Sequence, residues 1–271
     1  MNDNTLSVIY FGDETDYRKK KCGLSLMEQL LLSVNSIRNN WSKVVDIYFF
    51  HSETLSARTL HELHLLKVHI QKADRVIETE FPLSNKILIG ELYKGDKDIL
   101  FLDCDTIIHK PVNLETDNEM LVAYDAMKNI ETEDYIKVFD FLKLNLADIE
   151  LYESPAFEYY FHDKTKQFPV FNSGVFFLKK NLQHDFYFQY KRTFSDLYSK
   201  FKTDKWKFYI EQIAFSMTIV KLKINYSIFP KGYNFICTPR ADFLKNWDKN
   251  KIIIEHYAGD NGSPISFNHK S

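Results

Sequence analysis

Short apolar runs of strand length alternate with amphipathic stretches of helical length along the first half of this 271-residue chain. Such alternation is typical of βα units, in which a helix packs on the sheet after each parallel strand. The sequence therefore predicts an α/β fold with a mainly parallel central sheet flanked by helices. The expected strands cover residues 7–11, 44–51, 75–79, 98–108 and 120–124, and the expected helices cover residues 24–34, 56–67 and 84–93, the last with Ser84 as its N-cap.

The second half of the chain has a less regular order. An aromatic, turn-rich segment at residues 152–168 separates its first helix from the strand that follows. No internal repeat or low-complexity linker marks a boundary, so we expect one domain over residues 1–271 with a change of character near residue 125. The expected helices of this half cover residues 131–146, 183–201 and 208–220, and the expected strands cover residues 171–180, 225–229 and 251–257.

Charge and cysteine content exclude several classes of protein. The 35 Lys and Arg residues nearly balance the 37 Asp and Glu residues, whereas a nucleic-acid groove usually needs a basic face. Cys22, Cys104 and Cys237 are too few and too widely spaced to indicate a disulfide framework or a zinc ribbon. No signal peptide and no apolar run of about 18 residues is present, so we expect a cytoplasmic protein without a transmembrane segment.

The most informative stretch is the apolar run from Ile99 to Leu102, which is followed by Asp103 and Asp105. It places both carboxylates at the carboxyl end of a central strand, where open α/β sheets bind ligands. Residues i and i+2 of an extended chain point to the same side, so the two carboxylates can face one site. Two close carboxylates repel each other unless a cation or a proton lies between them. The pair therefore favours Mg²⁺ or Mn²⁺ bound together with substrate phosphate, although two aspartates can also simply cap a turn.

Two classes of enzyme carry an apolar strand that ends in Asp-x-Asp. Haloacid-dehalogenase-like phosphatases carry Asp-x-Asp-x-Thr near the start of the chain. Here Thr106 directly follows Asp105, and the motif lies about a hundred residues into the chain, so this alternative is the weaker one.

The second class is the GT-A glycosyltransferases, within which the sequence resembles glycosyltransferase family 8, the glycogenin and lipopolysaccharide-galactosyltransferase-like family. Blocks similar to those of the family occur in the family's order over nearly the whole chain. They are Tyr10-Phe-Gly-Asp-Glu-Thr-Asp-Tyr17, Ser84-Asn-Lys-Ile-Leu-Ile-Gly-Glu-Leu92, Phe101-Leu-Asp-Cys-Asp-Thr-Ile107, Phe171-Asn-Ser-Gly-Val-Phe-Phe-Leu178, Glu211-Gln212 and Ile254-Glu-His-Tyr-Ala-Gly259. The resemblance implies a GT-A fold, with a Rossmann-like nucleotide-sugar-binding half at residues 1–125 and a mixed acceptor-side half at residues 126–271.

The resemblance also implies roles for individual residues. Asp103, Asp105 and His256 would bind Mn²⁺ or Mg²⁺, and Lys86 would position the diphosphate or the donor sugar. Gln212 would lie near the reacting anomeric carbon, and Asp125 and Glu211 are the candidates for a catalytic carboxylate. The substrate-binding residues would be Tyr10, Phe11, Gly12, Asp13, Tyr17, Lys86, Asp103, Cys104, Asn172, Ser173, Gly174 and Gly259, with Asp125 also contacting sugar hydroxyls.

Each of these residues also has a plain structural reading. His256 could be a satisfied strand histidine, Lys86 could lie on a solvated helix face, and Gly174 could mark a strand bulge. One departure from the family is that no Lys-Pro-Trp element follows Gly259, so its phosphate-binding lysine is missing. Lys270, His269 or the backbone amides of residues 259–263 could replace that cation.

The predicted activity is metal-dependent transfer of a hexose from a nucleotide sugar, a UDP-sugar, with retention of configuration. The acceptor would be a glycan, a lipid-linked sugar or a protein hydroxyl in bacterial or viral surface-glycan synthesis. A non-catalytic relative that binds nucleotides or glycans is the alternative from another class. Aromatic residues make up 15% of the chain, and those within residues 152–168 are a candidate acceptor lid, with core packing or an oligomer contact as the alternative.

Overall fold

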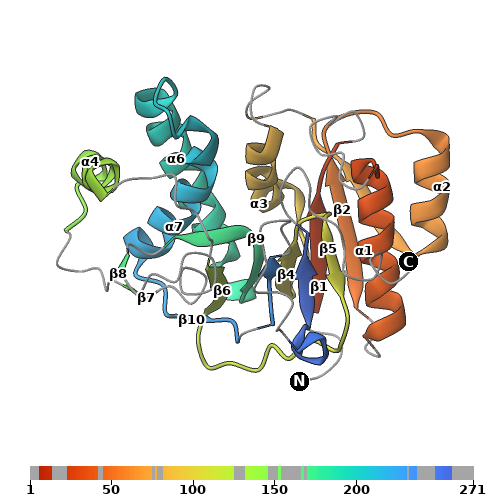
Figure 1. The fold of residues 1–271 in the computed structure, drawn as a ribbon. Coiled ribbons are helices and arrows are strands. Elements are labelled where there is room, and N and C mark those ends of the chain that lie inside the picture. The colour runs from red at the N-terminus through yellow and green to blue at the C-terminus, as the bar shows by residue number, and fades with distance from the viewer. Residues whose placement is uncertain are drawn as a thin grey trace.

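A seven-stranded sheet forms the centre of the molecule (Figure 1), with the strand order β10-β6-β9-β4-β1-β2-β3. Most neighbours in it are parallel, but β9 pairs antiparallel with both β4 and β6. The predicted mainly parallel sheet is thus confirmed. Its strands are β1 (Leu6–Phe11), β2 (Asp46–His51), β3 (Val68–Lys72), β4 (Asp98–Leu102), β6 (Met120–Tyr124), β9 (Phe171–Leu178) and β10 (Tyr226–Ile228). The computed structural model describes residues 6–13, 23–41, 45–74, 77, 82–124, 132–145, 152–153, 166–167, 170–230, 232–236 and 248–257.

Helices cover both faces of this sheet, as the β4 side chains show. Leu100 and Leu102 pack with α1 in one buried cluster, whereas Ile99 and Phe101 pack with α6 and α7 in another. This alternation follows from the two-residue period of a strand, and burial on both faces is what the apolar β4 sequence requires. The helices of the two faces are α1 (Leu26–Asn40) and α2 (Ala57–Leu65) on one side and α3 (Ile89–Leu92), α6 (Gln183–Phe201) and α7 (Ile210–Leu222) on the other.

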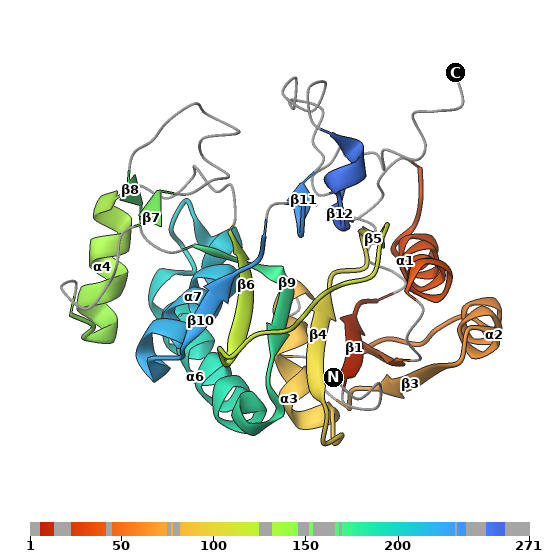
Figure 2. The same ribbon diagram turned by 90° about the horizontal axis from the view of Figure 1, so that it is seen from below.

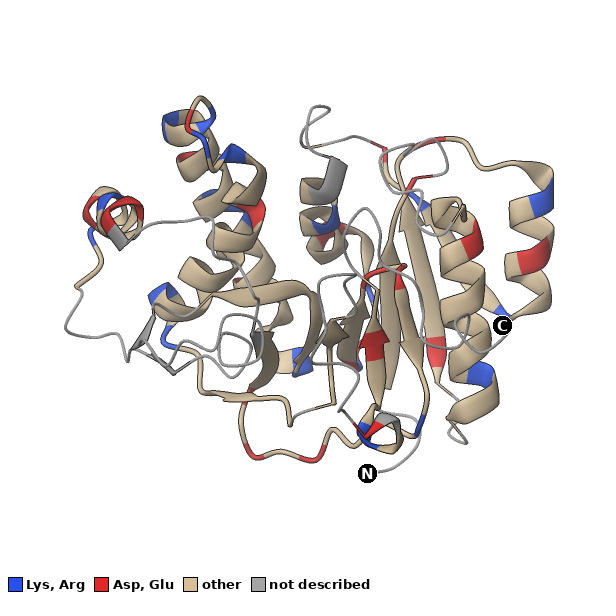
Figure 3. Cartoon of the chain, in the orientation of Figure 1, with Lys and Arg blue, Asp and Glu red and all other residues tan. Residues whose placement is uncertain are grey.

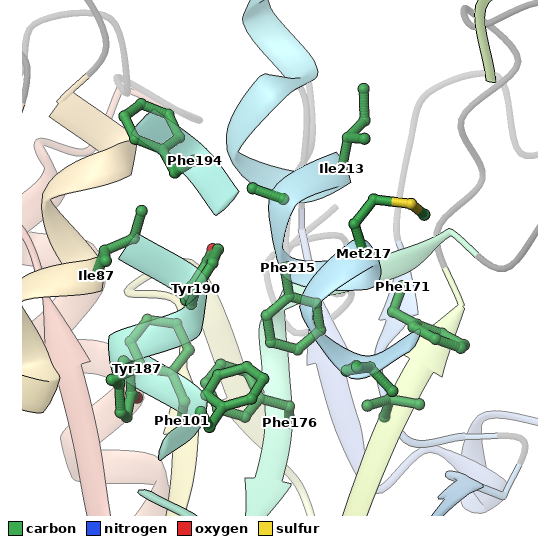
Figure 4. Packing of buried hydrophobic residues seen from close by; sticks show 14 of the residues in the cluster. Ile87, Phe101, Phe171, Phe176, Tyr187, Tyr190, Phe194, Ile213, Phe215 and Met217 are labelled. Carbon is green, nitrogen blue, oxygen red and sulfur yellow. The ribbon is translucent and has the colours of Figure 1, made fainter. Parts of the chain in front are cut away.

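Aromatic side chains fill the layer between the sheet and helices α6 and α7 (Figure 4). Phe101 of β4 stacks on Phe176 of β9 with ring centroids 5.2 Å apart. Phe215 of α7 lies 4.9 Å from Phe176, and Tyr190 of α6 lies 5.7 Å from Phe215. Such contacts contribute beyond the area that they bury. Part of the unusual aromatic content therefore builds the core.

A second, three-stranded sheet brings a distant segment of the chain next to the end of β4. Its order is β11-β12-β5, and β12 pairs antiparallel with β5 so that His256 lies opposite Thr106. Figure 2 shows these strands together beside α1. The strands are β5 (Thr106–Ile108), β11 (Phe235–Ile236) and β12 (Ile254–His256).

Helix α1 braces the start of β5. Its N-terminus carries a capping box in which Ser25 and Glu28 bond to each other's backbone N–H groups. The Ser33 hydroxyl lies 3.1 Å from that of Thr106, and the Ile108 amide donates to Ser36 Oγ over 2.9 Å. Contacts of buried polar groups at these distances hold the turn between β4 and β5 in one place.

The predicted strand at residues 98–108 is wrong as a single element. It is two strands, because the chain leaves the main sheet after Leu102 and turns at residues 103–105 into the small sheet. The Asp103 amide still donates to the Gly174 carbonyl over 2.7 Å, and the Thr106 hydroxyl donates to the Asp103 carbonyl over 2.8 Å. The turn directs the two aspartates away from the sheet.

One further expectation about the first half needs correction. Ser84 does not cap a helix, because it is fully buried inside a 3₁₀ helix, Pro82–Leu88, that runs into α3. The strand predicted at residues 75–79 lies outside the described residues except for Ile77, which is in a bend. The strand at the edge of the main sheet next to β2 is β3. It follows Lys67, which has φ of 54° and ends the turn after α2.

Each helix and strand predicted for the second half has a counterpart among the described residues, although the strand predicted at residues 251–257 is limited to Ile254–His256, because Lys251 belongs to a 3₁₀ helix. The remaining elements are short: α4 (Thr132–Leu142), the pair β7 (Tyr152–Glu153) and β8 (Lys166–Gln167), and the 3₁₀ helices Lys180–Leu182, Lys207–Tyr209 and Lys249–Lys251. Most of the predicted aromatic lid, including Phe157, Tyr159 and Tyr160, lies outside the described residues.

Charged residues are interspersed over the described helices, with Lys and Arg next to Asp and Glu on each of the larger ones (Figure 3). This agrees with the formal net charge of −2. A search for membrane-spanning helices among the described residues finds none of sufficient length and apolarity.

Candidate functional site

The turn after β4 and the end of β12 form a cluster of three side chains that can ligate a metal. Asp103, Asp105 and His256 each offer one ligand atom, and these atoms all lie within 4.8 Å of one another. His256 Nε2 is 3.3 Å from Asp105 Oδ1 and 4.0 Å from Asp103 Oδ2. Adjacent ligands of an octahedral Mg²⁺ lie about 3 Å apart, because each bond is about 2.1 Å long. Two carboxylates and an imidazole are also donors that Mn²⁺ accepts, so these residues fit a divalent ion.

Gly174 lies against this cluster from the neighbouring strand β9. The β6–β9 pairing shifts there, since Val122 faces Phe176 while Ala123 faces Asn172. The predicted strand bulge is therefore present. A Cβ atom on Gly174 would lie 2.3 Å from Asp103 Oδ2 and 2.9 Å from Asn172 Oδ1, so the site has no room for a larger residue. The Asn172 side chain accepts a hydrogen bond of 2.8 Å from the Gly174 amide.

Lys86 extends from the 3₁₀ helix into the same region and is only 6% exposed. The reading of Lys86 as part of a solvated helix face is therefore wrong. Its ammonium donates to the Ser173 hydroxyl over 3.0 Å and lies 3.5 Å from Asp103 Oδ1. It also lies 3.7 Å from Glu211 Oε1. A buried ammonium placed this way supplies a positive charge at fixed position beside the candidate metal ligand Asp103.

Glu211, in the first turn of α7, is the buried counterpart of Lys86. Its carboxylate accepts a bond of 3.0 Å from Ser173 and another from the Tyr190 hydroxyl of α6. Burial raises the pKa of the Glu211 carboxyl above its ordinary value, and the Lys86 ammonium opposes this rise. With two hydroxyl donors and one ammonium around it, Glu211 acts as an anchor for Lys86 and Ser173. Gln212, the next residue, is half-buried.

Residues 10–13 of the N-terminal block contribute to the fold through packing and hydrogen bonds more than they offer side chains to a ligand. Tyr10 is fully buried, with its hydroxyl 2.7 Å from Ser33, so its ring cannot contact a ligand at the sheet edge. Phe11 also belongs to the core, and its carbonyl accepts from the Cys104 thiol. Cys104 is itself 1% exposed, so its side chain likewise does not line the site.

Gly12 and Asp13 continue from β1 beyond the sheet. The Gly12 amide donates to Phe50 over 3.1 Å, and a Cβ atom there would lie 2.9 Å from a Leu26 methyl group. The Asp13 carboxylate accepts bonds of 2.6 Å from both the amide and the hydroxyl of Ser52. It therefore ties the end of β1 to the loop after β2. The remaining predicted site residues, Tyr17, Asp125 and Gly259, and the replacement cations His269 and Lys270, lie outside the described residues.

No pattern in the sequence indicates that Tyr190 and Asn234 contact the candidate site. Tyr190 lies within α6, where its spacing from Phe186 and Phe194 indicates only a core face. Asn234 lies in an irregular turn, yet its side-chain oxygen is 2.7 Å from His256 Nδ1. Both act on predicted site residues from segments remote in the chain, and a turn-forming Asn is too common to be singled out.

Comparisons with known proteins identify a family and a fold for this chain. The sequence profile of the Rhodobacterales glycosyltransferase domain matches residues 28–223. A search among curated proteins finds no match.

Several solved glycosyltransferases are similar to this chain in structure. The glycosyltransferase GlyE of Streptococcus pneumoniae TIGR4 is 15% identical to this chain, with a TM-score of 0.57. The match covers 94% of this chain and 55% of the GlyE chain. The galactosyltransferase LgtC, solved with donor and acceptor sugar analogues, is 12% identical to this chain, with a TM-score of 0.54. The match covers 93% of this chain and 87% of the LgtC chain. Mouse xyloside xylosyltransferase 1 is 13% identical to this chain, with a TM-score of 0.56, and the match covers 97% of this chain and 99% of the xylosyltransferase chain. The chain spans about half the length of the GlyE structure.

At these identities the similarity shows the fold. The predicted GT-A fold, with its mainly parallel sheet and helices on both faces, is confirmed.

Proposed function

The chain belongs to the family of the Rhodobacterales glycosyltransferase domain, and on this premise we propose that it transfers a sugar from a nucleotide-sugar donor to a hydroxyl acceptor. The proposed enzyme is metal-dependent and resembles glycosyltransferase family 8, with a UDP-hexose as donor and retention of configuration. The observation that carries the proposal is the convergence of Asp103, Asp105 and His256 beside Lys86 at the end of β4.

The metal in this proposal is Mn²⁺ or Mg²⁺, held by Asp103, Asp105 and His256. When bound, the ion would stabilise the negative charge that develops on the departing nucleoside diphosphate. The protein's contribution is to bring together two ligands from the turn between β4 and β5 and one from strand β12. Gly174 contributes by leaving space for the Asp103 carboxylate.

Lys86 and its partners form the second part of the proposed donor site. The Lys86 ammonium is held at fixed position by Ser173 and Glu211 and orients the donor's diphosphate or sugar. A charge that is already oriented costs no reorganisation during the reaction. Asn172 borders this region and would contact the donor sugar, and Gln212 would lie near its anomeric carbon. Because Glu211 is engaged by three partners, Asp125 is the better candidate for a catalytic carboxylate.

The remaining assignments follow the same proposal. Residues 1–125 would bind the nucleotide sugar, and residues 126–271 would bind the acceptor, a glycan, a lipid-linked sugar or a protein. The aromatic segment at residues 152–168 would close over that acceptor. We place the activity in the cytoplasm, where nucleotide sugars are supplied for surface-glycan synthesis.

The proposal is tested by binding and turnover of nucleotide sugars. With Mn²⁺ present, one UDP-sugar will raise the melting temperature, because a ligand that binds only the folded state stabilises it. The same donor will be hydrolysed slowly in the absence of an acceptor, and EDTA will abolish the hydrolysis. Binding without turnover of any donor would instead support a non-catalytic relative. Turnover of a simple phosphate monoester would support the phosphatase alternative.

Gly174→Ala provides a test of the close approach to Asp103. The new methyl group would overlap the Asp103 carboxylate, so we expect Mn²⁺ affinity to fall about tenfold or more. Isothermal titration with Mn²⁺ measures the change. Gly95→Ala is the matched control, because its Cβ would lie equally close, 2.3 Å, to the Tyr93 hydroxyl, which is remote from the aspartates. Equal Mn²⁺ affinities of Gly174→Ala and the unmodified protein would contradict the proposed geometry.

A further inference from the structure

The His256 ring makes a second contact, on the side away from the aspartates. Its Nδ1 atom lies 2.7 Å from the Asn234 side-chain oxygen, and both residues are buried, with exposed fractions of 3% and 8%. An amide oxygen can only accept a hydrogen bond, so Nδ1 of the ring carries the hydrogen. In the neutral ring Nε2 then has the free lone pair, and it is this atom that faces Asp105 and Asp103.

The backbone holds Asn234 in place for this contact. Asn234 has φ of 57°, in the left-handed region that Asn tolerates better than most residues. Gly232, two residues before Asn234, has φ of 99°. Its carbonyl accepts hydrogen bonds of 2.9 and 3.0 Å from the amides of Ile253 and Ile254. A Cβ atom on Gly232 would lie 2.1 Å from the Lys251 carbonyl oxygen. The turn is thus fastened to the strand that carries His256.

Strand pairing continues this attachment beyond Asn234. The next residues, Phe235 and Ile236, form β11 and pair in parallel with Glu255 and His256. The Asn234 side chain therefore starts from a backbone position that is fixed relative to the ring, so the contact needs no rearrangement on either side.

We infer that Asn234 is a positioning residue that fixes the tautomer and the ring orientation of His256 for metal binding. A metal binds the unprotonated ring nitrogen of a neutral imidazole, and the partner of the other nitrogen decides which one that is. The inference rests on the proposed function, because it requires that His256 binds the metal. It adds a residue from the 232–236 turn, which none of the sequence motifs includes.

The test compares two substitutions that differ in the acceptor. Asn234→Gly removes the acceptor while it keeps the left-handed backbone, and Asn234→Asp keeps an oxygen acceptor at the same place. We expect Mn²⁺ affinity, measured by isothermal titration, to fall 10- to 100-fold in Asn234→Gly and to stay close to that of the unmodified protein in Asn234→Asp. The melting temperature of each metal-free variant shows that it folds.

A second readout reports the tautomer without any metal. Long-range ¹H–¹⁵N correlation spectra of the metal-free, ¹⁵N-histidine-labelled protein will show His256 protonated at Nδ1, with its signals assigned by their loss in His256→Gln. In Asn234→Gly we expect this preference to be lost. A neutral ring with its hydrogen at Nε2 in the unmodified protein would overturn the inference.

The two proposals can fail separately. Equal Mn²⁺ affinity of Asn234→Gly and the unmodified protein would overturn the role of Asn234 and leave the proposed function in place. Absence of Mn²⁺ binding by the unmodified protein would overturn the metal dependence and, with it, the role of Asn234.

Discussion

Asp105→Asn will reduce metal-dependent hydrolysis of the donor at least about 100-fold. The substitution preserves the size of the side chain but removes one of the two carboxylate charges that face His256 Nε2. Loss of about 3 kcal/mol of stabilisation of the leaving group corresponds to about 100-fold in rate. Hydrolysis of the UDP-sugar identified by thermal shift, at saturating Mn²⁺, measures the effect.

Asp117→Asn is the control for this experiment. It makes the same chemical change at an exposed aspartate in the loop before β6. We expect its rate and its Mn²⁺ dependence to equal those of the unmodified protein. If Asp105→Asn retained full metal-dependent turnover, the assignment of the metal site would be wrong.

Lys86→Met will lower both stability and activity. The substitution keeps most of the buried side-chain volume but leaves the buried Glu211 carboxylate without its ammonium partner. Removal of one member of a buried ion pair costs about 3 kcal/mol or more, because the remaining charge stays desolvated. We expect a loss of this size in the free energy of unfolding by urea, and loss of donor hydrolysis at the same time.

A double substitution separates these two effects. Glu211→Gln removes the remaining buried charge, so Lys86→Met/Glu211→Gln will be more stable than Lys86→Met but will stay inactive. Lys97→Met is the control, because Lys97 forms a more exposed ion pair of 2.6 Å with Asp46, and such pairs contribute at most about 1 kcal/mol. Equal losses of stability in Lys86→Met and Lys97→Met would show that the buried pair has no special role.

The pKa of Glu211 determines in which direction the stability of Lys86→Met changes with pH. Burial already raises the pKa of Glu211 in the folded protein, and loss of the Lys86 charge will raise it further. A group with a raised folded-state pKa stabilises the protein below its ordinary pKa, and this contribution is lost as the pH rises through the folded-state value. Relative to the unmodified protein, Lys86→Met will therefore lose stability as the pH rises above the ordinary value of 4.5. Glu211→Gln in the same chain will remove this slope.

Much of the fold could be predicted because strands and helices leave periodic patterns in short windows of sequence. The helix predicted at residues 183–201 coincides with α6, and the apolar run before Asp103 coincides with most of β4. The errors occur where the chain changes direction. Only residues 103–106 separate the apolar residues of β4 from those of β5, and the bond from the Asp103 amide to Gly174 and the pairing with β12 explain the turn between them.

Residue types and their spacing were enough to single out Asp103 and Asp105 as candidate metal ligands, because two carboxylates after a buried strand reach the same edge of the sheet. Their relation to His256, Lys86, Glu211 and Asn234 depends on packing. Lys86 bonds to Ser173 across 87 residues of chain, and its helical segment gives no sign that it is buried. Contacts over such separations form only after the sheets have assembled, so a pattern confined to one segment cannot encode them. The three-dimensional arrangement thus explains why Glu211 contacts a lysine and why Asn234 contacts the histidine that we propose as a metal ligand.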